Sequence, residues 1–147
     1  ELATWKTAYE KLKNQHNTKA CDEYTKGFQM LEREGIFSPD KVPQIKEVSA
    51  LLEKTSGFRL RPTAGLVSPR DFLMNFAFRV FPCTQYVRHH SRPDHTPEPD
   101  MIHEFIGHVP MLLNRKFADF AHQLGLASVG ASDDVIKKIS TLFWFTI

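Results

Sequence analysis

Five of the seven histidines in this chain fall between residues 89 and 108, and the end of that window has the composition of a metal site. His103 and His108 stand five residues apart, and Glu104 directly follows the first of them. Neutral imidazoles are good ligands for divalent transition metals, and two histidines with one carboxylate form the triad of non-haem Fe(II) oxygenases. Because Glu104 points away from His103 on any helix, we interpret it as a neighbour of the metal and not as a ligand.

The spacing of the two histidines differs from that of the zinc-protease motif His-Glu-x-x-His, in which they are four residues apart. At about 100° per residue, five residues leave two side chains roughly 140° apart on a regular helix. The imidazoles can converge only if the helix loosens or ends between them, and Gly107 and Pro110 favour such a break. A zinc hydrolase stays open as a less favoured interpretation, as does a pair of histidines without a metal.

The segments that must position these side chains are mostly helical. Apolar residues recur at helical spacing within residues 2–12, 20–31 and 45–52, and each of these segments predicts a helix. Gly35 and Gly57 follow the second and third segments, where a C-terminal cap belongs, and Pro43 could open the third helix.

The spacing of the apolar residues changes from helical to alternating at Phe58. Residues 58–61 alternate between apolar and basic and predict a short strand that Pro62 stops. Ser68 and Pro69 predict the start of a helix. We expect that helix to bury Phe72, Phe76 and Val80 and to end at Pro82; residues 83–88 then favour a second strand.

The last third alternates between loop and helix. Residues 91–99 contain three prolines and predict a shaped loop, and a short helix follows from Asp100 to about residue 107, limited by Pro110. Asn114 and Ser132 are expected N-caps of two further helices. The inner face of the last helix is expected to hold Val135, Ile139, Leu142 and Phe143. Its most apolar turn is its last and has no cap, so we expect the natural chain to continue.

Composition sets the class of protein. The chain has 147 residues, 41% of them hydrophobic, and a net charge of +2. These values fit one globular domain and argue against disorder, a nucleic-acid-binding surface and a membrane span. Two cysteines are too few for a disulfide framework, so a soluble, cytoplasmic protein is the expectation.

Several motifs occur together and in a fixed order. They are Arg61-Pro-Thr-Ala-Gly-Leu, Ser68-Pro-Arg-Asp-Phe-Leu, Phe78-Arg-Val-Phe, Cys83-Thr-Gln-Tyr-Val-Arg-His, Thr96-Pro-Glu-Pro-Asp, His103-Glu-x-x-Gly-His-Val-Pro, Gly125-Leu-Ala-Ser and Trp144-Phe-Thr. This series resembles the catalytic domain of the pterin-dependent aromatic amino acid hydroxylases. The resemblance implies a mainly α fold of that type with a few short strands. It also implies that residues 1–147 are the N-terminal portion of a single catalytic domain, truncated at its C-terminus.

The resemblance also implies a site. His103 and His108 would bind Fe(II), and the third ligand of the family, a glutamate, would come directly after Ile147. The remaining roles concern the pterin and the substrate. By position, tetrahydrobiopterin would be held by Gly65, Leu66, Val67, Phe72 and Glu104, and the catalytic and substrate-binding residues would be Glu104, Arg88, Thr96, Pro97, Pro99 and Trp144.

Each of these roles has a structural alternative. Leu66, Val67, Phe72 and Trp144 could be ordinary core, and Arg88 could be a surface arginine. The chain also departs from the family at Pro69 and Pro82, where some members carry polar groups near the pterin, and at Phe143, where a tyrosine is usual.

The implied activity is an iron- and tetrahydrobiopterin-dependent monooxygenase that uses O2 to hydroxylate an aromatic amino acid. Tyrosine is the favoured substrate, which implies a tyrosine 3-monooxygenase of catecholamine synthesis; phenylalanine 4-monooxygenase and tryptophan 5-monooxygenase are alternatives. A further alternative is a truncated, catalytically incompetent product that lacks the third iron ligand. Family members often form homotetramers through a C-terminal helix, and no such segment occurs in this sequence.

Overall fold

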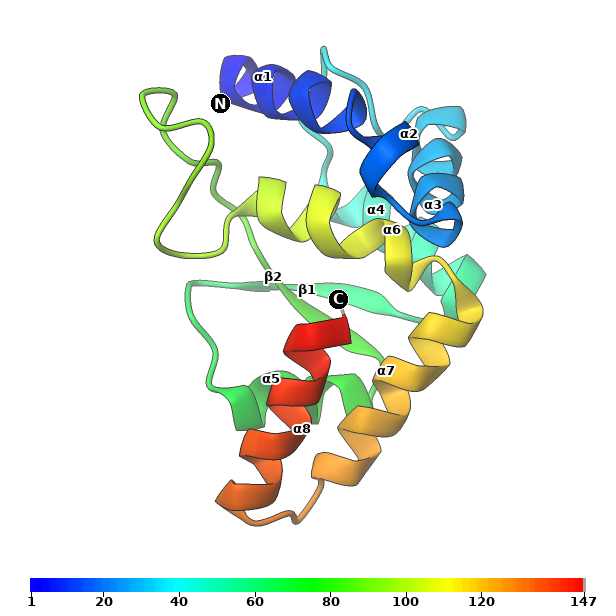
Figure 1. Ribbon diagram of the computed structural model, residues 1–147, viewed down its shortest axis with the longest axis vertical. Coiled ribbons are helices and arrows are strands. Elements are labelled where there is room, and N and C mark those ends of the chain that lie inside the picture. The colour runs from blue at the N-terminus through cyan, green and yellow to red at the C-terminus, as the bar shows by residue number, and fades with distance from the viewer. Residues whose placement is uncertain (147) are drawn as a thin grey trace.

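The computed structural model describes residues 1–146, and most of them are helical (Figure 1). In chain order the elements are α1 (Leu2–Lys13), α2 (His16–Lys19), α3 (Asp22–Arg33), α4 (Ile45–Ser56), β1 (Arg59–Thr63), α5 (Pro69–Ala77), β2 (Val80–Thr84), η1 (His103–His108), α6 (Val109–Leu112), α7 (Arg115–Ser128) and α8 (Asp133–Thr146). The expected mainly α fold with a few short strands is confirmed. Within residues 1–146, no helix combines the length and the apolar character that crossing a membrane requires.

The first three helices form one end of the molecule, drawn in blue in Figure 1. Their core is aromatic: the ring of Trp5 packs edge-on against Phe37, and Tyr9 and Phe37 both contact Phe28. The indole of Trp5 is fully buried and donates a hydrogen bond to the carbonyl of Ser38 at 2.8 Å. The predicted helices are confirmed here, and Gly35 and Gly57 adopt the left-handed conformation expected after α3 and α4.

The two strands pair in parallel, with Arg59 opposite Val80 and Thr63 opposite Thr84, and α5 lies in the connection between them. The prediction that Pro62 stops the first strand is wrong, because β1 continues to Thr63. A two-stranded sheet has only edge strands, and an edge strand tolerates a residue without an N–H group.

Helix α5 starts as predicted, since the Ser68 hydroxyl accepts a hydrogen bond from the backbone N–H of Asp71. It ends at Ala77, so the expectation that it includes Val80 and ends at Pro82 is wrong. Both residues belong to β2, which also lies earlier than the predicted 83–88. The chain turns through Arg79, whose left-handed φ of 53° sequence patterns do not indicate. The guanidinium of Arg79 donates to the Ser56 carbonyl and to Asp119, which fixes that turn.

Helices α7 and α8 pack against each other and against α5. The Asn114 side chain caps α7 as expected, accepting from the N–H of Phe117. The expected inner face of α8 is partly wrong: Val135 and Leu142 are exposed, whereas Ile136 and Phe143 are buried. The apolar face that α8 turns toward α5 and α7 is therefore rotated around the helix axis from the predicted face. Ile147 lies outside the described residues.

Candidate metal centre

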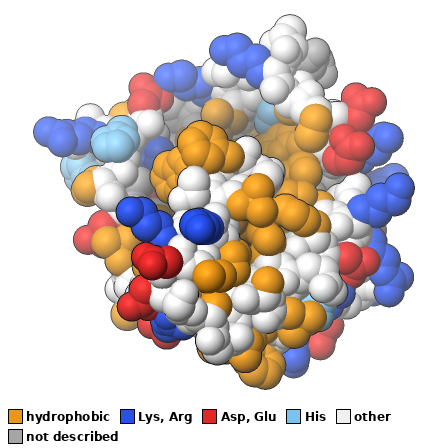
Figure 2. Space-filling model, turned by 60° about the horizontal axis from the view of Figure 1, so that its bottom comes forward, with side chains coloured by type: hydrophobic (Ala, Val, Ile, Leu, Met, Phe, Trp, Pro, Cys, Tyr) orange, Lys and Arg blue, Asp and Glu red, His pale blue; other side chains and the backbone are white. Residues whose placement is uncertain are grey.

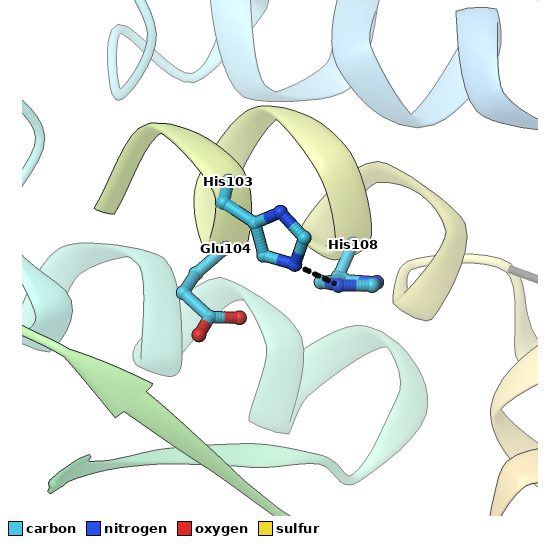
Figure 3. Close-up of side chains that lie close together, drawn as sticks. All are labelled: His103, Glu104 and His108. Atoms are coloured by element: carbon cyan, nitrogen blue, oxygen red, sulfur yellow. Dashed lines mark hydrogen bonds between the residues drawn. The ribbon is translucent and has the colours of Figure 1, made fainter. Parts of the chain in front are cut away.

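The helix that carries the histidines contains a π-helical turn over His103–His108. In this turn the N–H of Val109 bonds to the carbonyl of Glu104, five residues earlier. The wider turn brings residues five apart round to the same side, so the Nε2 atoms of His103 and His108 lie 3.0 Å apart (Figure 3). The predicted loosening of the helix is confirmed. However, Pro110 does not limit the helix, which continues through α6.

The distance between the two nitrogens fits a shared metal ion. Two imidazole nitrogens at about 2.1 Å from one ion, and at a right angle to each other, are about 3.0 Å apart. The carboxylate of Glu104 completes a group whose ligand atoms all lie within 4.8 Å of one another. Within residues 1–146 this is the one such cluster of three histidine, cysteine or acidic side chains.

Both imidazoles are held in the neutral form that binds metals. Burial and the neighbouring His103 lower the pKa of His108 to about 3, and burial also lowers the pKa of His103. The Nδ1 atom of His108 is buried and has no hydrogen-bond partner among the described residues. Its Nε2 atom lies 3.0 Å from Nε2 of His103, so a metal ion between them would meet both Nε2 lone pairs when each ring carries its proton on Nδ1.

Glu104 lies beside this point in a buried position. Burial, and then the charge of Asp100, raise the pKa of its carboxyl group to about 8. The group is therefore mainly protonated at neutral pH in the metal-free protein. A cation placed between the imidazoles would favour the carboxylate, so Glu104 can exchange a proton when a charge arrives at the site.

The three side chains open into a cavity of about 500 Å³. Its lining consists of Val67, Pro69, Phe72, Leu73, Pro99, His103, Glu104, His108, Ser140, Phe143 and Trp144. Of the predicted site residues, the cavity thus brings together both histidines, three of the five pterin residues (Val67, Phe72 and Glu104), Pro99 and Trp144. The sequence does not predict a site role for Leu73 or Ser140, although Ser140 precedes Trp144 by one helical turn and shares its face.

The walls of the cavity are aromatic. Phe72 contacts the rings of Phe76, Phe81 and Phe143, at centroid distances of 4.8 to 5.6 Å. Trp144 also lines the cavity, and 78% of its surface is exposed, so it is not part of the core that the described residues form. Such a wall suits a flat, aromatic ligand.

The other predicted site residues do not line this cavity. Gly65, Leu66, Thr96 and Pro97 lie outside its lining, and Leu66 is 74% exposed, which also excludes a core role for it. Their assigned roles stay predictions.

Arg88 lines a neighbouring cavity of about 430 Å³ that it shares with His103. Its guanidinium donates to both carboxylate oxygens of the fully buried Asp100, at 2.9 and 2.7 Å. The same carboxylate accepts from the backbone N–H groups of Arg88 and His103, at 2.8 and 3.0 Å. Asp100 therefore ties the loop to the start of the metal-binding turn. Sequence patterns give it no such role, because the partner is twelve residues away.

Comparison with known proteins finds relatives that match the whole chain. A family model described as "Biopterin-dependent aromatic amino acid hydroxylase" matches residues 1–147. Tyrosine 3-monooxygenase of Schistosoma mansoni is 57% identical over the whole chain, which covers 32% of that protein. Phenylalanine-4-hydroxylase of Caenorhabditis elegans is 51% identical, also over the whole chain and 32% of the relative. The chain thus spans about a third of the length of these relatives.

Solved structures show the same fold. Phenylalanine hydroxylase of Colwellia psychrerythraea 34H superposes with a TM-score of 0.91 at 30% identity, over the whole chain and 55% of that protein. The enzyme of Chromobacterium violaceum, solved with bound iron(III) and oxidised 7,8-dihydrobiopterin, superposes with a TM-score of 0.89 at 32% identity, over 99% of the chain and 52% of the neighbour.

Proposed function

The chain belongs to the biopterin-dependent aromatic amino acid hydroxylases, and from that membership we propose that it forms part of an iron- and tetrahydrobiopterin-dependent monooxygenase. The observation that carries this proposal is the 3.0 Å separation of the His103 and His108 Nε2 atoms on an aromatic cavity. A neutral imidazole pair supplies two of the three protein ligands of a mononuclear Fe(II) site with two histidines and one carboxylate.

The residues divide the work at this site. His103 and His108 would hold the iron, which together with the pterin supplies the activation of O2. Phe72 and Val67 offer an apolar wall for the pterin, and Trp144 and Pro99 line the side left for the substrate ring. These apolar side chains exclude water, and Glu104 accepts or returns a proton beside the metal. Gly65, Leu66, Thr96, Pro97 and Arg88 belong to the proposed cofactor and substrate contacts on the strength of family resemblance.

We infer tyrosine as the substrate, with phenylalanine next. Support comes from the relatives: the tyrosine 3-monooxygenase is 57% identical, the phenylalanine-4-hydroxylase 51%. An aromatic pocket separates two substrates that differ by one hydroxyl only weakly. The inferred role is the ring hydroxylation that leads to catecholamines, in the cytoplasm and within a homo-oligomer.

Iron binding and product analysis test the proposal. The protein that contains this chain should bind one Fe(II) and convert tyrosine, with tetrahydrobiopterin and O2, to a product heavier by one oxygen atom. His103→Ala and His108→Ala should each lower the iron content at least tenfold, while His90→Ala, on the exposed loop, should leave it unchanged. Equal iron content in all four proteins would contradict the proposal.

A second titration tests the third ligand. The 147-residue chain is compared with the same chain carrying one added glutamate, or one added glutamine, after Ile147. Tighter Fe(II) binding with glutamate than with glutamine supports a carboxylate ligand at that position. Equal affinities argue against it.

A further inference from the structure

The π-helical turn that brings the histidines together contains a carbonyl that a regular helix would leave without its partner. In an α-helix the carbonyl of Ile106 would accept from the residue four positions later, which is Pro110. Proline has no N–H group, and its ring presses against that same carbonyl. The sequence therefore leaves this carbonyl, which lies between the two metal-binding histidines, without its α-helical partner.

A side chain from another helix meets this acceptor. The hydroxyl of Tyr24, on α3, donates to the carbonyl oxygen of Ile106 at 2.7 Å. Burial raises the pKa of the Tyr24 phenol, so it remains a donor at any physiological pH. Tyr24 does not line the cavity into which His108 and Glu104 open, so it reaches the turn from another side.

The same face of α3 fixes the helix at a second point. Gly27, three residues after Tyr24, lies so close to the helix that a β-carbon there would be 2.0 Å from the carbonyl oxygen of Pro110. The two backbones are therefore in direct contact in α6, just after the π-turn, while the Tyr24 hydroxyl bonds to a carbonyl within the turn. The close contact at Gly27 prevents α6 from moving nearer to α3, and the Tyr24 hydrogen bond opposes movement of the turn away from α3.

We propose that Tyr24 is a positioning residue for the metal centre: by satisfying the Ile106 carbonyl that Pro110 leaves free, it holds the π-turn that sets the separation of His103 and His108. The expected effect on metal binding rests on the proposed metal centre, whereas the hydrogen bond from Tyr24 to Ile106 does not. Tyr24 touches no ligand atom and acts only through the backbone of η1.

The test compares two tyrosines. Tyr24→Phe removes the hydroxyl and keeps the ring, and Tyr9→Phe is the matched control, because the Tyr9 hydroxyl also donates to a partner, Glu32, from a neighbouring helix. Co(II) is the probe, and its visible absorption reports the ligand geometry. Tyr24→Phe should weaken Co(II) binding by about tenfold, the loss of one hydrogen bond, and shift the absorption bands. Tyr9→Phe should change neither the Co(II) affinity nor the absorption bands, even if it lowers thermal stability as much as Tyr24→Phe does.

A measurement without metal completes the test. Hydrogen exchange at the Val109 amide, which closes the π-turn on Glu104, should accelerate in Tyr24→Phe and not in Tyr9→Phe. Failure of the unsubstituted protein to bind Co(II) would remove the proposed metal centre, and the exchange rates would then decide the role of Tyr24. Unchanged exchange at Val109 in Tyr24→Phe would overturn the positioning role, as would unchanged Co(II) affinity and spectrum in a protein that binds Co(II).

Discussion

Asp100 shows how much one buried side chain can determine about this site. It is fully buried, pairs with the guanidinium of Arg88 and caps the backbone of His103. Asp100→Asn should lower the free energy of unfolding by about 3 kcal/mol, because it leaves the Arg88 charge without its partner. Urea unfolding measures this loss. Asp40→Asn is the control, since the Lys6–Asp40 pair is exposed and should change stability by less than about 0.5 kcal/mol. Similar losses in both variants would show that burial of the pair is unimportant.

The same carboxylate gives a pH dependence. Burial raises the pKa of Asp100, but the hydrogen bonds from Arg88 and the two backbone N–H groups outweigh it, so the pKa lies below the ordinary value of 3.8. A lowered pKa contributes stability that is complete above 3.8 and is lost as the pH falls through the folded-state value. The difference in unfolding free energy between the unsubstituted protein and Asp100→Asn should be constant from pH 7 to about 5. Below pH 4 it should shrink. A difference that grows on acidification would contradict this assignment.

Among the elements, α5 and α7 pack at backbone distance. A β-carbon on Gly125 would lie 2.2 Å from the backbone nitrogen of Ala77. Gly125→Ala should therefore force the helices apart and cost about 2 kcal/mol or more, measured by denaturant unfolding. Gly107→Ala is the matched control, because a β-carbon there meets no atom within 4 Å. A destabilised control with an unaffected Gly125→Ala would refute the packing argument.

The elements also show what sequence patterns can and cannot predict. Helical periodicity and the caps at Ser68 and Asn114 are local, and the structure confirms them. The limits of β1 and β2 depend on the pairing of the two strands, so local patterns do not predict that Pro62 and Val80 are strand residues. The histidine spacing predicts a loosened helix, but the contact that holds it comes from Tyr24, 82 residues away. Such a contact leaves no signal in the local sequence.

At the scale of the whole molecule, exposed hydrophobic side chains are distributed unevenly over the surface. Figure 2 shows hydrophobic side chains in several groups on one face. The end of α8 exposes Leu142, Trp144 and Phe145, the last at 81%. A patch of large apolar side chains in water promotes association. The 147-residue chain should therefore associate with rising concentration in analytical ultracentrifugation, and Phe145→Ser should weaken that association.

Phe78→Ser serves as the control for this prediction. Phe78 is 69% exposed but lies outside the end of α8, so its replacement should leave association unchanged. If the chain stays monomeric at about 100 µM, the exposed apolar side chains at the end of α8 do not cause association.

The parallel pairing of β1 and β2 has a consequence for the order in which the chain acquires its structure. Arg59 and Val80, the first partners, are 21 residues apart (80 − 59), and the intervening segment must cross over before a single strand hydrogen bond can form. Closing that long loop lowers the entropy of the chain more than closing the short loop of a β-hairpin would. Helix α5, which has its own cap, can shorten the search by forming early. Weakening that cap should thus slow refolding more than it speeds unfolding.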